Sequence, residues 1–208
     1  MRVLLIGSIF LGLISIIALL TQRNYDRDKK IDVPELRESD SINFAQIREA
    51  LPPMENPHIV IKKKKRLLQI FDGEKLVRKY KIVLGFAPLA DKQIEGDGKT
   101  PEGTFYVFTK NDQSRFHVSL GISYPNVEDA ERGLKNEIIT TEEYEAIVKA
   151  IAKKQMPPQK TALGGEIYIH GGGAAESDWT DGCLALQNEE MKEIFDAIPV
   201  GTDVKIEP

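Results

Sequence analysis

The stretch IYIHGGG, residues 167–173, followed by TDGC, residues 180–183, indicates both the fold and the chemistry of this chain. It contains Cys183, the only cysteine in 208 residues, and His170, one of three histidines. A thiolate is a strong nucleophile, and an imidazole transfers protons near neutral pH. The surrounding glycines favour a site that other groups approach closely. The structural alternative is a buried, inert Cys183 beside a hydrogen-bonded strand histidine.

The composition is that of an ordinary globular protein, with 41% hydrophobic and 29% charged residues. A net charge of −4 gives no reason to expect nucleic-acid binding. One basic run stands out, KKKKR at residues 62–66. We expect it to be a solvated strand edge, with weak binding to an anionic polymer or a membrane surface as the alternative.

The N-terminal segment predicts a hydrophobic membrane helix. Residues 3–20 are almost wholly apolar and carry no charge, and a helix of that length rises about 27 Å, close to the thickness of a bilayer core. The run ends without a small-x-small cleavage site, which favours an uncleaved signal-anchor over a cleaved signal peptide for residues 1–22. We therefore expect an exported protein, on the periplasmic or cell-wall side and anchored in the inner membrane. The basic residues that follow the run would by themselves favour the opposite orientation; they are Arg23, Arg27, Lys29 and Lys30.

A polar stretch broken by prolines follows, so residues 23–57 are predicted to be a linker and residues 58–207 the folded domain. Asp72-Gly73 is a hairpin turn signal between two apolar runs. Apolar and alternating patterns predict strands at 59–61, 66–71, 75–85, 105–108, 116–122, 167–170 and 203–206, with a short apolar piece at 184–186.

Two helices are expected late in the chain. Thr140 and Glu143 form a capping-box pattern ahead of an amphipathic helix that runs to about Lys154. Asn188 is the expected N-cap of a second helix, which carries Met191 on its apolar face. The whole pattern predicts a mainly β domain with peripheral helices.

The Cys/His stretch fits acyl transfer through a thioester. His170 would take the thiol proton of Cys183, and the resulting ion pair would lower the pKa of the thiol. Gly182 would leave backbone N–H groups free to stabilise an oxyanion. The carbonyl of Gly171 or a neighbour could hold the second imidazole nitrogen.

These residues resemble the L,D-transpeptidase catalytic domain family, which has the YkuD-like fold, and within it the YafK-like branch. The resemblance covers most of residues 58–207, and several motifs in the expected order carry it. They are GDGKTPEG at 96–103, FHVSL at 116–120, ISYPN at 122–126, IYIHGG at 167–172 and DGCLAL at 181–186. The resemblance implies a YkuD-like β-sandwich, here preceded by the N-terminal hydrophobic helix.

The resemblance also implies roles for individual residues. Cys183 matches the nucleophile, which attacks the carbonyl of the L-centre of a diamino acid in a peptidoglycan stem peptide. His170 matches the general base. Gly171 matches the position whose carbonyl orients that base, and Thr180 matches the Ser/Thr before Gly-Cys. Gly182, together with Cys183, would supply the oxyanion donors.

Two further residues are candidates for the substrate cleft. His117 lies in a matched segment, and a strand histidine on the outer face is the alternative. Trp179 adjoins the catalytic loop, and a packing residue is the alternative.

Two departures from the family pattern bear on the substrate. Asp181 stands where many members have a histidine, and it is either an orienting carboxylate or a loop cap. Ala185 stands where many have an arginine thought to hold a substrate carboxylate. The loop between His170 and Cys183 is also shorter than usual. These changes leave the nucleophile and the base in place but leave open whether the acyl group is crosslinked or hydrolysed.

We therefore expect a cysteine L,D-transpeptidase that acts on peptidoglycan stem peptides without a cofactor. The alternatives are a hydrolase of the same fold, either an L,D-carboxypeptidase or an enzyme that releases a wall-attached lipoprotein, and a non-catalytic wall-binding module. No metal is expected, because His170, Cys183, Asp181 and His117 lack zinc-like spacing.

Overall fold

The computed structural model describes residues 50–173 and 177–208. The expected hydrophobic helix at residues 1–22 and most of the expected linker at 23–57 lie outside these residues. Within the described part of the chain, no helix combines the length and the apolar character that crossing a bilayer requires.

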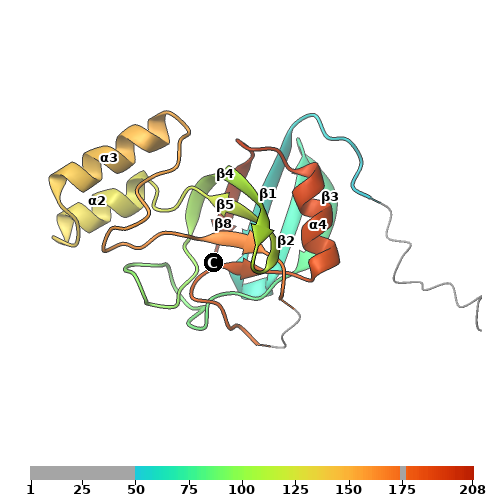
Figure 1. Ribbon diagram of the computed structural model, residues 1–208, viewed down its shortest axis with the longest axis horizontal. Helices are drawn as coiled ribbons and strands as arrows, with labels where there is room; N and C mark the ends of the chain where they lie inside the picture. The colour runs from blue at the N-terminus through green and yellow to red at the C-terminus, as the bar shows by residue number, and fades with distance from the viewer. Residues whose placement is uncertain (1–49, 174–176) are drawn as a thin grey trace, which may run out of the picture. The chain divides into compact units, whose positions relative to one another are not determined.

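Eight strands form one mixed sheet (Figure 1). Its order is β3-β2-β1-β8-β4-β5-β6-β7. The β1–β8 and β6–β7 pairs are parallel, and the other neighbours are antiparallel. The strands are β1 (Pro57–Lys62), β2 (Leu67–Asp72), β3 (Lys75–Lys81), β4 (Gly103–Ser114), β5 (His117–Ile122), β6 (Tyr168–His170), β7 (Leu184–Ala185) and β8 (Asp203–Glu207).

The two ends of this sheet are joined by the chain that follows β3. Val83 and Ala185 exchange backbone hydrogen bonds, each 3.0 Å long. Gly85 forms a second bridge, to Thr180. The expected long strand at 75–85 therefore ends at Lys81, and its remainder closes the sheet. The domain is mainly β with a few helices, as predicted, but its strands form one curved half-barrel rather than the two stacked layers of a sandwich.

Strand alternation places one face of the sheet in the core. Ile59 and Ile61 of β1 and Val204 and Ile206 of β8 are all buried. Helix α4 (Asn188–Ala197) packs against β5 and contributes Met191 to the same core. The C-terminal strand β8 therefore lies in the middle of the sheet, between β1 and β4, and ties the two ends of the domain together.

Helices α2 (Val127–Lys135) and α3 (Thr141–Ala152) pack side by side, away from α4 (Figure 1). Helix α3 begins with the predicted capping box of Thr140 and Glu143. Helix α2 was not predicted, because its sequence is mostly polar and few apolar residues mark a helical face. It begins with a capping box of its own, formed by Asn126 and Asp129.

Two predicted element boundaries need correction. Helix α4 has Gln187 as its N-cap, and the side chain of Asn188 instead accepts a hydrogen bond from the Gly172 N–H at 2.8 Å. Strand β4 extends to Ser114, well past the predicted end at residue 108, because its polar tail pairs with β5 in a hairpin. The sheet thus holds a longer hairpin than the apolar pattern alone indicates.

The basic run at residues 62–66 is also only partly solvated, and it does not lie at an edge of the sheet. Lys63 is only 2% exposed. Its Nζ donates to the carbonyls of Ala90 at 2.6 Å and Thr100 at 2.7 Å, and to the Glu102 carboxylate at 2.8 Å. Arg66 pairs with Asp178 at 2.6 Å. These acceptors compensate the burial of the Lys63 ammonium, so Lys63 and Arg66 hold loops of the domain together.

Candidate active site

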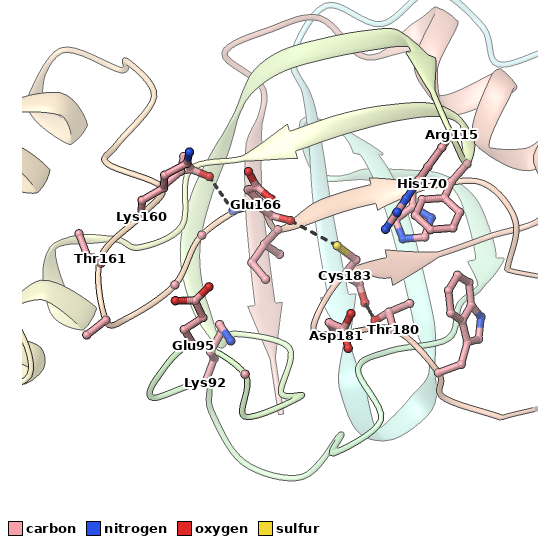
Figure 2. A pocket seen from close by; sticks show the side chains of 18 residues that line it. Lys92, Glu95, Arg115, Lys160, Thr161, Glu166, His170, Thr180, Asp181 and Cys183 are labelled. Carbon is pink, nitrogen blue, oxygen red and sulfur yellow. Dashed lines mark hydrogen bonds between the residues drawn. The ribbon is translucent and has the colours of Figure 1, made fainter.

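A cavity of about 930 Å³ contains both His170 and Cys183 (Figure 2). Besides His170 on β6, four segments line it: the loop at 92–96, the turn at 115–116 between β4 and β5, the loop at 159–167, and the residues from 179 to 183. Parallel pairing of β6 with β7 brings the histidine strand beside the segment that follows Cys183. The sheet topology, rather than sequence proximity, therefore brings the two residues into one pocket.

The His170 side chain is held in one orientation. Its Nδ1 lies 2.6 Å from the carbonyl oxygen of Gly171. A carbonyl only accepts, so in the neutral imidazole Nδ1 carries the hydrogen and Nε2 keeps a lone pair. The ring stacks on Phe116 at 4.6 Å between centroids and meets Trp179 edge-on at 5.9 Å. These contacts leave Nε2 as the basic nitrogen.

Burial lowers the pKa of His170 below its ordinary value, and the positive charge of Arg115 lowers it further. The hydrogen bond to the Gly171 carbonyl opposes this shift only in part. The imidazole is therefore neutral at pH 7 and able to accept a proton.

The Cys183 thiol is hydrogen-bonded to backbone groups rather than to the His170 imidazole. Its Sγ donates to the Glu166 carbonyl at 3.4 Å and accepts from the Tyr168 N–H at 3.4 Å. Burial raises the pKa of the thiol to about 11, and the negative charge of Asp181 adds to that shift. The expected ion pair with a lowered thiol pKa is therefore wrong for this state of the molecule. Cys183 is a neutral thiol at pH 7.

Glu166, which sequence reasoning missed, positions the carbonyl that holds the thiol. Its backbone has φ of 54°. Gln159 fixes that conformation, because its Oε1 accepts the Glu166 N–H at 2.7 Å while its Nε2 donates to the Tyr124 carbonyl at 3.0 Å. At Gly165, a Cβ would lie 2.5 Å from the Gln159 carbonyl oxygen. The Gly164-Gly165 pair was the sequence signal for this close approach.

Thr180 holds the loop that carries the thiol. Its buried hydroxyl donates to the Cys183 carbonyl at 2.7 Å and accepts the Gly182 N–H at 3.2 Å. The Gly182 N–H therefore already has a partner, which contradicts the expectation that it is free for an oxyanion. Gly182 has φ of 130°, and a Cβ there would lie 2.7 Å from the Lys99 carbonyl oxygen. The turn therefore requires glycine at position 182, both for its backbone conformation and for this close approach.

The other predicted residues take different places. Asp181 is exposed at the edge of the pocket, and Nδ1 of His170 is oriented by Gly171 instead. Trp179 lines the pocket. His117 is exposed and is not among the lining residues; its neighbour Phe116 faces the pocket. Phe116 lies in the turn before β5, and His117 is the first residue of that strand.

Charged side chains that the motifs did not mark also line the pocket. They are Lys92, Glu95, Arg115, Lys160 and Glu166. Figure 2 shows Glu166 and Lys160 on one side of Cys183, and Arg115 beside His170 on the other. Among the described residues, no three His, Cys, Asp or Glu side chains are arranged to hold a metal ion.

A family model for the L,D-transpeptidase catalytic domain, YkuD, matches residues 56–206. A search of curated proteins found no match.

Solved structures with the same fold include the helical cell shape determining protein Pgp2 from Campylobacter jejuni. It is 24% identical with a TM-score of 0.50, and the match covers 76% of this chain and 50% of that one. Bd1075 from Bdellovibrio bacteriovorus is 20% identical with a TM-score of 0.47, over 76% and 52% of the two chains. An L,D-transpeptidase from Mycobacterium smegmatis is 12% identical with a TM-score of 0.43, over 74% and 59%.

The likeness to Pgp2 shows a shared fold and no more. The chain spans about half the length of the first two structures, Pgp2 and Bd1075.

Proposed function

The chain belongs to the L,D-transpeptidase catalytic domain family, and from that premise we propose that it is a cysteine acyltransferase acting on peptidoglycan stem peptides. Cys183 is the nucleophile and His170 the general base. One observation carries the assignment: a histidine whose Nδ1 is fixed on a carbonyl shares a pocket with the only cysteine of the chain. This arrangement leaves a basic Nε2 on the same cavity as a thiol.

The reaction follows from these two groups. Nε2 of His170 takes the thiol proton while Sγ attacks the scissile carbonyl, which gives a tetrahedral oxyanion. The C–N bond then breaks, and the imidazolium returns its proton to the departing amine of the terminal D-amino acid. A thioester on Cys183 remains. An amine from a second stem peptide, or water, attacks it, loses a proton to His170, and releases the thiol.

The resting thiol must first leave the Glu166 carbonyl and turn toward His170. With a thiol pKa of about 11, a preformed thiolate is scarce at neutral pH. Proton transfer to His170 is therefore coupled to the attack. The Thr180 hydroxyl keeps the Cys183 backbone in place during this rotation.

Crosslinking and hydrolysis share the same acyl-enzyme. Ala185, at the position of the family arginine, is fully buried and its backbone pairs with Val83. Position 185 therefore contributes no cation to the pocket. Either an amine or water can then serve as the acyl acceptor. Hydrolysis is the second candidate, as an L,D-carboxypeptidase or in the release of a wall-attached lipoprotein.

The test is incubation of the full chain with defined muropeptides, followed by product masses. Crosslinking joins two stems with loss of a terminal D-amino acid, whereas hydrolysis adds water. Cys183→Ala is expected to reduce turnover at least about a thousandfold, and His170→Gln to reduce it severely as well. His117→Gln, an exposed histidine outside the pocket, is the matched control and should retain activity.

The proposal fails if Cys183→Ala turns over at the wild-type rate. Retained muropeptide binding without any wild-type turnover would instead support a wall-binding module. A stoichiometric carbapenem adduct, seen by intact mass in the wild type and lost in Cys183→Ala, is a second expected result.

We also propose that the domain works on the periplasmic or cell-wall side, held to the inner membrane through residues 3–20. Those residues form an uncharged apolar run. Fractionation of cells and a reporter fused to the C-terminus test this location. A cytosolic reporter would overturn it.

A further inference from the structure

The family arginine is missing, but another cation faces the same pocket. Three basic residues line it: Lys92, Arg115 and Lys160. Lys92 is 2% exposed, and its Nζ donates to Asp97 and to the Ile94 carbonyl, each at 3.0 Å. Its ammonium is therefore already bound within its own loop. Arg115 and Lys160 are exposed. They are the two cations on which a substrate anion could be held.

Arg115 has the more defined position. It lies in the turn between β4 and β5, with its guanidinium 4.7 Å from the Phe116 ring centroid. Phe116 in turn stacks on His170 at 4.6 Å. Within residues 50–173 and 177–208, no acidic side chain forms a salt bridge with Arg115. A cation held on an aromatic face keeps its N–H donors available and loses little conformational freedom on binding.

Arg115 also lies on the side of the pocket where the leaving group is expected. Figure 2 shows Arg115 beside His170, across Cys183 from Glu166. His170 returns its proton to the leaving amine, so the leaving D-amino acid must lie on the His170 side of the thiol. The carboxylate of that residue is separated from its amine by a single Cα. It therefore falls near the guanidinium.

We propose that Arg115 binds the terminal carboxylate of the donor stem peptide and makes the enzyme selective for donors that end in a free carboxylate. This assignment rests on the proposed function. The planar guanidinium fork matches a carboxylate with two parallel hydrogen bonds, which a lysine does not reproduce. Arg115 is thus a specificity-determining residue supplied by the β4–β5 turn, where the family position at 185 supplies none.

The first test measures binding without turnover. In a Cys183→Ala background, the full chain is titrated with two synthetic stem peptides that differ only in a terminal carboxylate or carboxamide. Arg115→Ala should weaken the carboxylate peptide about tenfold and leave the carboxamide peptide within about twofold. Arg115→Lys should fall between. Lys79→Ala, an exposed lysine on β3 away from the pocket, should change neither.

The second test measures turnover with Cys183 present. Arg115→Ala should raise KM for the carboxylate donor with a smaller effect on kcat. Loss of the positive charge should also raise the pKa of His170, so the acidic limb of the kcat/KM profile moves to higher pH. A residue that only packs against Phe116 would move neither the carboxylate preference nor the limb.

The outcomes separate this inference from the proposed function. Equal weakening of both peptides by Arg115→Ala overturns the assignment, as does a carboxylate preference that depends on Lys160→Ala instead. The wild type could instead show a carboxylate preference that depends on Arg115 and yet turn over neither donor. That result would overturn the proposed reaction and support the anion site.

Discussion

At the scale of single residues, Cys183, the proposed nucleophile, is in an unreactive form. The thiol rests on the Glu166 carbonyl, is partly covered, and has a pKa of about 11. His170 is buried and neutral. Neither group carries charge at pH 7, so neither bears the desolvation cost of a buried ion pair. In the proposed reaction, charge develops only when Sγ attacks a substrate carbonyl.

The raised pKa of the Cys183 thiol predicts slow alkylation at neutral pH. A pKa of about 11 leaves roughly one thiol in ten thousand ionised at pH 7, and the fraction rises tenfold per pH unit up to that pKa. Iodoacetamide labelling followed by intact mass should accelerate with pH, with a midpoint near the thiol pKa. Glutathione labelled in parallel is the control. A midpoint at or below pH 8 would show a preformed ion pair instead.

The close packing around Gly171 predicts that a larger side chain at this position destabilises the domain. A Cβ at that position would lie 2.6 Å from Asn188 Oδ1 and 2.7 Å from the Phe116 carbonyl oxygen. Gly171→Ala should therefore reduce the free energy of unfolding by about 1–3 kcal/mol, measured by urea denaturation. Gly201, with φ of 92° and open space around its Cβ position, is a control that reports backbone strain alone. Wild-type stability for Gly171→Ala would contradict the packing described here.

At the scale of elements, the pocket depends on how short segments are tied down rather than on long strands. Strand β6 has three residues and β7 has two. Parallel pairing between them, the Asn188 side chain on the Gly172 N–H, and the backbone bridge from Val83 to Ala185 hold this region. Helices α2 and α3 form a separate small core with Leu163, which supports the loop at 159–167.

The two capping boxes predict unequal stability effects. Asn126 and Asp129 of the α2 box are buried, whereas Thr140 of the α3 box is exposed. Thr140→Ala should cost about 1 kcal/mol. Asn126→Ala should cost more, about 2–3 kcal/mol, since it also leaves a buried partner unsatisfied. Thermal unfolding of the two variants tests the order, and equal melting temperatures would contradict it.

At the scale of the whole molecule, one curved sheet and a few long-range polar contacts determine the pocket. The buried Nζ of Lys63 ties three acceptors that lie 27 to 39 residues further along the chain. Arg66, next to it, reaches Asp178, whose carboxylate also accepts the Leu84 N–H at 2.8 Å. These contacts connect the start of the domain to the loops that border the site.

Lys63→Met is therefore expected to destabilise the domain by about 3 kcal/mol, because two carbonyls and a carboxylate lose their buried partner. Lys64→Met, one residue on and exposed, is the matched control and should change stability by less than about 0.5 kcal/mol. Denaturant unfolding measures both. Similar losses for the two variants would show that the run acts only through charge.

The sequence by itself determined what depends on local pattern. Alternating apolar residues predicted the strands of the core, the Thr140–Glu143 box predicted α3, and the Cys183 and His170 motifs indicated the candidate site. These signals lie within a few residues, where backbone preference and side-chain periodicity act.

Only the tertiary structure decided the features that arise from contacts distant in sequence. It joined the edges of the sheet, buried Lys63, placed the Glu166 carbonyl on the thiol, and brought Arg115 beside His170. It also reversed the expected direction of the thiol pKa. The physical reason is common to all of these: burial and charge proximity depend on packing between segments, which neither composition nor spacing specifies.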